Sequence, residues 1–484
     1  MASPLELIGL IAACGAAAAA ILAPRAGWQP AALVIALLAA PLLVLGDVWD
    51  GSRVSDLRED PAVVAAALGV AAAAVAVGAV VMRRIEWAFP VLALAALALR
   101  LPVRFGGETS NLLIPLYLVI TSQLAATLGR GRPAPAREAL AVVWLRRALA
   151  ATLVLYAVQA AYSDDVSNAI ENAGFFLVPF AVLFCQLAAF RWDERALRAA
   201  AIAVGVVGAA LATVAIAQFA ARDLIFNKDL LDSNQIKPFF RVNSLFFDPN
   251  VLGRYMALGV IAMGAAIAWS RGGLAAIWGL AGGALMLAGL ALSFSLTSIA
   301  ALLAGLGVLA LLRYGLRGGV AAAAAILATG AVFVVSGGLD RPDIGPVRGF
   351  DEETSGRGAL LEGGFDLITD EPVLGWGSGA FGRAYFDEVR KTETTASHSE
   401  PITVAAEQGI PGAVVYIGLL AAMAWALLGG GAGAAAGGVG AAAGRAAASA
   451  GVVALVVHSL GYAGFLTDPA TWALLALAVG LRSR

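Results

Sequence analysis

Charged residues are scarce in this chain of 484 residues. Only 13% of the residues are Asp, Glu, Lys or Arg, whereas 60% are hydrophobic. Soluble globular proteins contain about 25% charged and about 45–50% apolar residues, so this composition excludes a soluble enzyme and a disordered chain. The 32 basic and 33 acidic residues give a net charge of -1, which indicates no nucleic-acid partner. The chain is therefore predicted to be a polytopic membrane protein.

Cysteine, histidine and lysine are also rare. The two cysteines, Cys14 and Cys185, both lie in apolar runs, which argues against a disulfide framework and against a thiolate metal site. The two histidines, His398 and His458, lie far apart in the sequence, so neither a metal nor a cofactor is predicted. The three lysines fall in two polar segments, at Lys228, Lys237 and Lys391.

Long apolar runs fill most of the chain. There are fourteen or fifteen of them, most close to the length of about 20 residues that one spanning helix needs. Each run is predicted to be a helix, because lipid offers the backbone no hydrogen-bond partners. The first run, at residues 5–23, lacks a basic flank and is interpreted as an uncleaved spanning helix. The predicted fold class is all-α, a polytopic transmembrane helical bundle.

Arginine positions predict the orientation of this bundle. Arginines fall on every second connection, which the positive-inside rule assigns to the cytoplasm. They occur at residues 83–84, 130–147, 191–198, 271, 313–317, 445 and 482–484. The connections between them are acidic or neutral and are expected to face outward. A count of fifteen helices then places the N-terminus outside and the C-terminus in the cytoplasm.

Two outward connections are too long to be turns, and they divide the chain. Residues 1–199 are predicted to form N-terminal transmembrane helices. Residues 200–336 form central transmembrane helices with an outer loop at 221–249. Residues 337–400 form a large periplasmic loop, and residues 401–484 form C-terminal transmembrane helices. Loops this long usually fold and carry function.

Few polar groups are predicted at membrane depth. Gln159, Gln218 and His458 are the main ones. Ion-coupled transporters usually place Asp, Glu or Lys near the membrane midplane, so the helices argue against transport. The chemistry is therefore expected on the outer surface.

The first outer loop contains a candidate anion site. Asp248 followed by Pro249 is typical of an N-cap and first turn, so a spanning helix is predicted to start there. Arg241 lies shortly before this start, and a helix N-terminus with an arginine suits a phosphate. The alternative is that Arg241 pairs with loop carboxylates or reaches lipid headgroups. Arg254 and Lys237 are further substrate-binding candidates.

The second outer loop holds two more candidates. Leu360, Leu361, Phe365 and Ile368 recur at helical spacing after Arg357, which predicts an amphipathic helix along the membrane surface. The G-x-G-x-x-G pattern at residues 377–382 lacks a preceding strand and is not interpreted as a dinucleotide site.

His398 lies just before the next spanning helix, where an imidazole could take a proton from an acceptor hydroxyl. The alternatives are a partly solvated loop histidine for His398 and an exposed ion pair for Arg357. His458, inside a helix, is interpreted as a core histidine.

Four motifs follow one another along the predicted outer face. They are R-x6-D-P-N at residues 241–250, S-x-T-S at 295–298, P-x-x-G-W-G-x-G-x-F at 372–381 after Arg357, and H-S-E at 398–400 followed by E-Q-G-I-P-G at 407–412. Their order resembles the O-antigen ligase and O-antigen polymerase family of bacterial envelope glycosyltransferases, over roughly residues 200–470. The arginine that follows the S-x-T-S position in many members is absent here.

The resemblance implies a helical bundle of the glycosyltransferase C type in the bacterial inner membrane. Members take a glycan from undecaprenyl diphosphate at the periplasmic face and pass it to an acceptor hydroxyl on a glycan or a lipid-linked glycan. By motif position, Arg241 and Arg357 would hold the diphosphate and His398 would be the essential histidine. Glu400 would assist in substrate binding, and Glu400 or Glu407 would set the histidine tautomer. The expected transfer is metal-independent and inverting.

Several functions fit this resemblance. The acceptor would be lipid A-core sugar in a lipopolysaccharide ligase or another carrier-linked repeat in a polysaccharide polymerase. Protein serine or threonine would be the acceptor in a protein O-oligosaccharyltransferase. A non-enzymatic alternative is a lipid-linked glycan flippase or transporter. The sequence leaves the choice between ligase and polymerase open.

Overall fold

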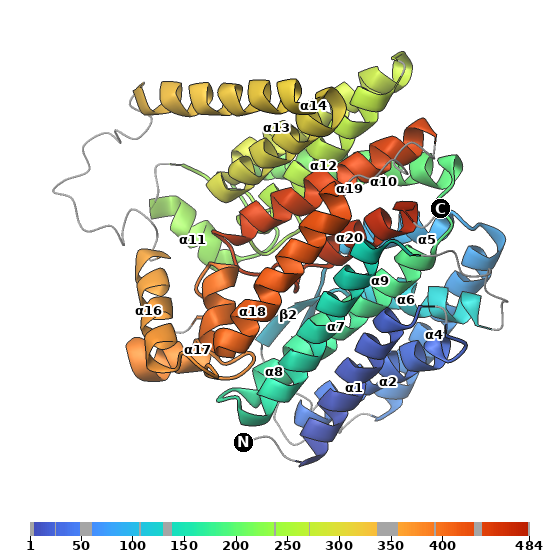
Figure 1. The fold of residues 1–484 in the computed structure, drawn as a ribbon, viewed down its shortest axis with the longest axis vertical. Coiled ribbons are helices and arrows are strands. Elements are labelled where there is room, and N and C mark those ends of the chain that lie inside the picture. Colours follow the sequence, from blue (N-terminus) through green and yellow to red (C-terminus); the bar gives the residue numbers. More distant parts are fainter. Residues whose placement is uncertain are drawn as a thin grey trace.

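The structure is a computed structural model, and it consists mainly of long helices (Figure 1). It describes residues 4–24, 26–48, 61–105, 108–128, 138–236, 239–270, 272–335, 357–391, 394–429 and 438–482. In these ranges eleven helices are long and apolar enough to cross a membrane, and three more apolar helices are shorter. The predicted polytopic helical bundle is confirmed, and the chain is a multi-pass membrane protein. The glycosyltransferase C type stays a prediction.

The first half of the chain contributes nine α-helices and one hairpin. The helices are α1 (Pro4–Leu22), α2 (Gln29–Val48), α4 (Pro61–Arg84), α5 (Ala88–Leu97), α6 (Ile114–Thr127), α7 (Leu140–Gln159), α8 (Val166–Asn172), α9 (Val178–Ala189) and α10 (Glu194–Ala221). A 3-10 turn (Ala160–Tyr162) and a π-helical segment (Ala173–Leu177) flank α8. Asp165 and Asp193 cap α8 and α10, because each side chain accepts a hydrogen bond from a backbone N–H three residues later.

The described part of the second half of the chain contributes nine more helices. They are α11 (Lys228–Ile236), α12 (Pro249–Trp269), α13 (Leu274–Ser293), α14 (Leu296–Val335), α16 (Arg357–Asp370), α17 (Phe381–Ala384), α18 (Glu400–Leu428), α19 (Val439–Ser459) and α20 (Pro469–Arg482), with α17 continuing as one π-helical segment (Tyr385–Val389). Two of them are broken at a glycine with positive φ. α14 breaks at Gly315, between the apolar runs at about residues 297–312 and 319–336, and α18 breaks at Gly409.

Two apolar cores hold the bundle together. The larger core joins the N-terminal helices to α18, α19 and α20, and the smaller one joins α10, α12, α13 and α14 to α19. Small residues allow the close approach of helices that membrane bundles require. A Cβ atom at Gly208 or Gly259 would overlap the Met286 thioether, so α10 and α12 approach α13 at these two glycines. Because α19 belongs to both cores, it fixes one group of helices against the other.

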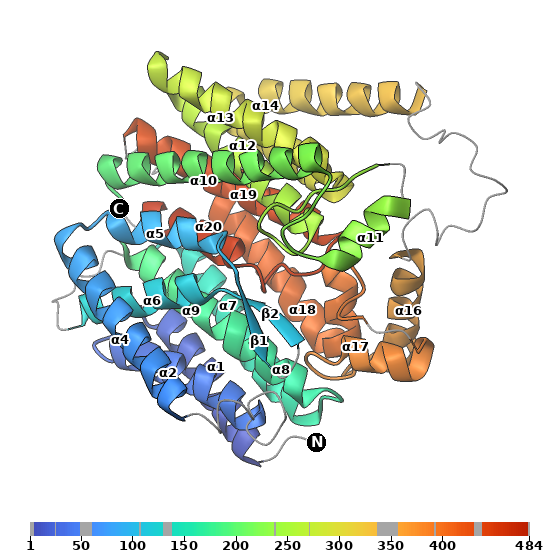
Figure 2. The same cartoon turned by 180° about the vertical axis from the view of Figure 1, so that it is seen from behind.

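A short antiparallel hairpin interrupts the expected helical pattern between α5 and α6. Strands β1 (Leu101–Phe105) and β2 (Glu108–Leu112) pair with Leu101 opposite Leu112. Figure 2 shows the hairpin running from α5 toward α8. The apolar runs at about residues 87–101 and 110–128 predict two spanning helices here, but α5 has only 10 residues and α6 only 14. Neither helix reaches the length of about 20 residues that a full crossing needs.

The described part of the large outer loop forms a cap at one end of the bundle. α16 and α17 lie beside α18 at this end, while the C-terminus lies at the other (Figure 1). Leu367, Phe381 and Tyr385 form a small core there with Ala406 of α18. The predicted helix after Arg357 is present as α16. Phe365, which the helical pattern assigns to its apolar face, is instead 59% exposed, because Leu367 is the residue that packs inward.

Candidate functional site

The start of α12 and the end of α13 together position Arg241. Asp248 caps α12 as predicted, and its Oδ1 accepts a hydrogen bond of 2.6 Å from the backbone N–H of Asn250. The Arg241 Nε donates to the carbonyl of Ser293 at 3.0 Å, and its Nη2 donates to Asn250 Oδ1 at 3.4 Å. The side chain of Asn234 in α11 bonds both the backbone N–H and the carbonyl of Arg241. Arg241 is therefore held, half-buried, across the ends of two helices.

The S-x-T-S motif continues this polar network into the bundle. The Ser295 hydroxyl donates to Asn250 Oδ1 at 2.9 Å and lies 2.8 Å from the Ser298 hydroxyl. Ser298 Oγ also lies 3.1 Å from His458 Nε2. His458 and both serines are buried. The structure thus places His458 in the core, and a chain of hydrogen bonds links it to Asn250 and Arg241.

The connection between α19 and α20 brings Tyr462 to the same place. Its hydroxyl donates to Asp248 Oδ2 at 3.0 Å. Its ring lies 5.5 Å from the His458 ring and 6.2 Å from the His398 ring, measured between centroids. Burial, reinforced by the negative charge of Asp248, raises the pKa of Tyr462. The phenol therefore stays protonated and remains a hydrogen-bond donor to Asp248.

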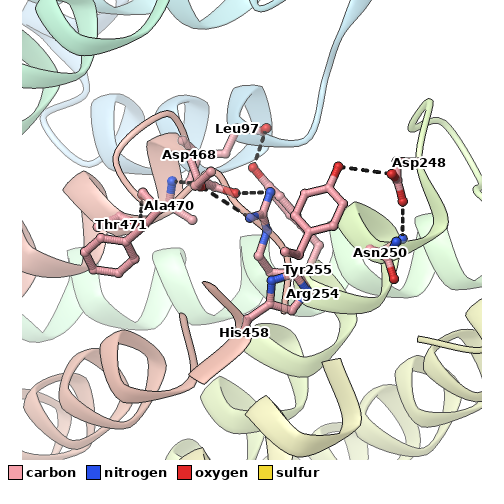
Figure 3. Close-up of polar contacts among 12 residues, drawn as sticks. Leu97, Asp248, Asn250, Arg254, Tyr255, His458, Asp468, Ala470 and Thr471 are labelled. Atoms are coloured by element: carbon pink, nitrogen blue, oxygen red, sulfur yellow. Dashed lines mark hydrogen bonds and ion pairs between the residues drawn. The ribbon is translucent and has the colours of Figure 1, made fainter. Parts of the chain in front are cut away.

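Arg254 and Asp468 form a buried ion pair (Figure 3). The Arg254 Nη2 lies 2.5 Å from Asp468 Oδ2, and the two side chains are only 6% and 1% exposed. Asp468 Oδ1 also caps α20 by accepting a bond of 2.7 Å from the Ala470 N–H. The guanidinium carbon of Arg254 lies 5.7 Å from the centre of the Tyr462 ring. Since the charge of Arg254 is already balanced, this arginine holds the α19–α20 connection against α12.

His398 occupies a strained turn directly before α18. Its φ of 61° lies in the left-handed region, which few residues other than glycine adopt, and such strain clusters at functional sites. Ser397 stabilises the turn: its hydroxyl donates to the Ser399 carbonyl at 2.8 Å and lies 2.9 Å from the Thr403 hydroxyl. The side chain of His398 is half-buried and faces the Tyr462 ring.

Glu400 ties the start of α18 to the α19–α20 connection. Its Oε2 accepts hydrogen bonds from the backbone N–H groups of Gly464 at 2.6 Å and Phe465 at 3.1 Å. These contacts bring the His398 turn and the Tyr462 segment together. Glu400, which is expected to bind substrate, thus accepts hydrogen bonds from backbone amides in this structure.

Glu407 docks the glycine-rich turn of the outer loop onto α18. Its two carboxylate oxygens accept hydrogen bonds from the N–H groups of Gly379 and Phe381, at 3.0 and 3.3 Å. The Gly377 N–H donates to the Glu407 carbonyl at 2.8 Å. Gly379 has a φ of 78°, and a Cβ atom there would lie 2.8 Å from the Ala169 nitrogen. The glycines are therefore explained by close backbone approach, and the Glu407 carboxylate holds the loop through its backbone amides.

Two other candidates lie at the edge of what the structure describes. Arg357 is the first residue of α16, but its side chain lies outside the described residues. Lys237 lies outside them altogether. Within the described ranges, no group of three or more His, Cys, Asp or Glu side chains could hold a metal ion. Arg241 thus contacts Asn250 in the first turn of α12, and the His398 ring faces Tyr462, which bonds Asp248 at the start of the same helix.

Sequence reasoning missed Tyr462 and Asp468. The sequence does contain a pattern that points to Asp468 as a helix cap, because Asp468-Pro469 repeats the Asp248-Pro249 pattern at the start of α12. Nothing in the sequence pairs Asp468 with Arg254, which lies more than 200 residues earlier.

The comparison with known families agrees with the order of motifs. Residues 281–417 match the family model described as O-antigen ligase. This segment runs from within α13 to the middle of α18 and includes His398, Glu400 and Glu407. The predicted relation to the O-antigen ligase and polymerase family is confirmed by this match. No curated protein matches the chain.

Proposed function

Since residues 281–417 carry an O-antigen ligase family domain, we propose that this glycosyltransferase-like protein uses undecaprenyl diphosphate as the donor carrier. The glycan passes to an acceptor hydroxyl at the periplasmic face of the bacterial inner membrane. The observation that carries the proposal is the convergence of Arg241, His398 and Tyr462 around the start of α12. These residues come from three separate segments of the chain, as a site requires and a lipid-facing surface does not.

The donor diphosphate binds at Arg241 in this proposal. The Arg241 guanidinium lies at the N-terminal end of α12, where the first backbone N–H groups also favour an anion. Arg357 at the start of α16 supplies a second guanidinium. Arginine stays charged and matches phosphate oxygens in bidentate fashion. The two guanidinium groups stabilise the charge that develops on the leaving diphosphate, the role a divalent metal has in other enzymes.

His398 receives the proton of the acceptor in this proposal. The acceptor oxygen attacks the anomeric carbon, a new glycosidic C–O bond forms, and the bond from that carbon to the diphosphate oxygen breaks. The proton of the acceptor hydroxyl passes to the imidazole, and the electron pair of the broken bond leaves with the diphosphate. One in-line displacement inverts the anomeric configuration. The Tyr462 ring lies against His398 and supports its orientation.

The orientation of the site follows from the distribution of arginines. The site lies at the starts of α12, α14, α18 and α20, whereas Arg271 follows the end of α12, Arg313 lies just before the break in α14 and Arg482 ends α20. By the positive-inside rule these arginines face the cytoplasm, so the site faces the periplasm. A glycan already moved outward on its lipid carrier would meet the site there.

Alanine variants test the proposal in membranes that contain the full-length protein. Arg241→Ala and His398→Ala are expected to lower glycan transfer by about 10²–10³-fold, the range for removing a charge-stabilising or acid–base group. Arg383→Ala is the matched control, because Arg383 is an exposed arginine of the same outer loop that pairs with Asp387 at 2.7 Å. Full transfer by both site variants would refute the proposed mechanism.

Deletion of the gene distinguishes the acceptors. If the deletion strain lacks the glycan-capped acceptor but still makes long carrier-linked polymer, the protein is a ligase. If the strain makes only single glycan repeats and no polymer, the protein is a polymerase. Unchanged envelope glycans with loss of a glycosylated protein indicate protein O-glycosylation. Accumulation of the lipid-linked glycan at the cytoplasmic face would instead identify a flippase.

A further inference from the structure

A short turn of the outer loop presents two large apolar side chains outside any spanning helix. Residues 372–375, here called the apolar turn, connect α16 to the glycine-rich turn that Glu407 holds. Within the apolar turn, Val373 is 60% and Leu374 is 55% exposed. Adjoining exposed apolar side chains mark a contact with another molecule or with a membrane. The helices against which the apolar turn packs indicate which of the two it is.

The apolar turn packs against the break in α18. The N–H of Ile410, directly after the break at Gly409, donates to the carbonyls of Pro372 and Val373, both at 3.2 Å. A Cβ atom at Gly409 would overlap the Val373 carbonyl oxygen, so this glycine allows the close approach. The apolar turn therefore lies at the level of Ile410 along α18.

The exposed side of α18 is apolar without interruption from the break onward. Ile410, Val414 and Ile417 are exposed and recur at helical spacing. Residues 410–428 contain no charged side chain. This stretch rises about 28 Å, which matches a hydrocarbon core about 30 Å thick. In a multi-pass membrane protein this side of α18 faces lipid, and Ile410 lies at the edge of the hydrocarbon nearest the outer loop.

The neighbouring helix α7 gives the same level independently. α7 and α18 pack side by side, and the exposed side of α7 runs from Trp144 through Val154 and Val158 to Tyr162 in the 3-10 turn that follows. Trp and Tyr are enriched at the two membrane–water interfaces, and Trp144 and Tyr162 are separated by a rise of about 27 Å. The Tyr162 hydroxyl donates to the Leu374 carbonyl at 2.9 Å. The apolar turn therefore lies at the interface that Tyr162 marks.

The carbonyls of the apolar turn suit this position. The Ile410 N–H bonds the carbonyls of Pro372 and Val373, and the Tyr162 hydroxyl bonds that of Leu374. Backbone groups need such partners within the protein wherever lipid replaces water. The apolar turn therefore exposes its aliphatic side chains while its carbonyls are satisfied by the two lipid-facing helices.

We propose that the apolar turn inserts Val373 and Leu374 into the bilayer leaflet at this end of the bundle. The occupant of the surface is bilayer lipid, because the surface continues the lipid-facing sides of α7 and α18. Asp370 and Glu371 precede the turn and are exposed, so insertion stops where these carboxylates reach the headgroup layer. The insertion anchors the outer loop to the membrane. It goes beyond the proposed function and does not depend on the transfer reaction.

Spin labels test the depth of the apolar turn in the full-length protein, with one copy in each phosphatidylcholine nanodisc. Val373→Cys or Leu374→Cys carries the nitroxide. The background is Cys14→Ala/Cys185→Ala, because both native cysteines are buried and unpaired. The measurement is the ratio of nitroxide accessibility to oxygen, which concentrates in lipid, over accessibility to a nickel chelate, which stays in water.

Two further labels calibrate this ratio. Ile417→Cys reports the lipid-facing side of α18, and Arg383→Cys reports an exposed position of the same outer loop. The ratio at positions 373 and 374 is expected to match the ratio at 417 and to exceed the ratio at 383 several-fold.

Each outcome decides the inference. A ratio at 373 and 374 that matches the ratio at 383 overturns it, because the turn then lies in water. Low accessibility to both reagents also overturns it, because protein then covers the turn. If added farnesyl diphosphate lowers oxygen accessibility at 373 and 374 but not at 417, the surface binds a prenyl chain instead of bilayer lipid, and the inference fails. A high ratio that farnesyl diphosphate leaves unchanged supports the inference, whether or not the protein transfers a glycan.

Discussion

The hydroxyl of Tyr462 donates a hydrogen bond of 3.0 Å to the carboxylate of Asp248 across 214 residues of sequence. Asp248 is also the cap of α12, and the Tyr462 ring faces both histidines of the protein. This single contact joins the loop that holds Arg241 to the last connection of the chain. It makes the outer end of the bundle one polar unit rather than a set of separate loops.

Tyr462→Phe removes this hydrogen bond and keeps the ring. A hydrogen bond to a charged group contributes about 1.5–3 kcal/mol, so we expect a lower Tm and a reduced rate of transfer. Differential scanning fluorimetry and a membrane transfer assay measure the two effects. Tyr314→Phe is the control, because Tyr314 is 66% exposed and removing its hydroxyl should change neither the Tm nor the rate of transfer. A Tyr462→Phe protein with the Tm and the transfer rate of the wild type would show that the hydrogen bond is dispensable.

Asp468→Asn leaves Arg254 as an uncompensated charge in a buried position. Breaking such a pair typically costs about 3–5 kcal/mol, and the Ala470 cap is weakened as well. The thermal stability of the detergent-solubilised protein should therefore fall strongly. The double variant Arg254→Met/Asp468→Leu should recover part of the loss, since no charge remains unpaired. Equal destabilisation by the single and double variants would contradict the assigned pairing.

His398→Gly separates backbone strain from imidazole chemistry. Glycine adopts the φ of 61° at His398 without steric cost, so the variant should be at least as stable as wild type. Transfer should nevertheless fall by about 10²–10⁴-fold, because the proton acceptor is gone. His398→Asn, which also tolerates this conformation, should behave in the same way. An active His398→Gly enzyme would assign the histidine a purely conformational role.

Gly379→Ala should detach the glycine-rich turn from the bundle. The new Cβ would lie 2.8 Å from the Ala169 nitrogen at a positive φ, so the N–H bond from residue 379 to Glu407 is expected to break. Hydrogen exchange of residues 376–382 should become faster. Gly418→Ala is the matched control in α18, because no atom lies within 4 Å of the added Cβ. Protected amides in the Gly379→Ala protein would contradict the docking role of Glu407.

The sequence predicts the helices of this protein more fully than it predicts the contacts of the site. The apolar runs and the Asp248-Pro249 cap are local signals, and they located most helices correctly. The pair α5 and α6 is the exception. Their runs look like spans, but β1 and β2 pair as a hairpin with Leu101 opposite Leu112, so each strand supplies backbone hydrogen bonds to the other.

The sequence by itself determined that this chain forms a bundle of membrane-spanning helices. It also predicted that Arg241, His398 and the family motifs lie at the same end of that bundle. It could do so because the lipid solvent requires every spanning backbone to satisfy its own hydrogen bonds, and that requirement acts on about 20 residues at a time. Only the tertiary structure decided that Asp468 neutralises Arg254 and that Tyr462 bonds Asp248. These contacts depend on which helices pack together, and packing in lipid is set by side-chain fit across distant segments rather than by any local pattern.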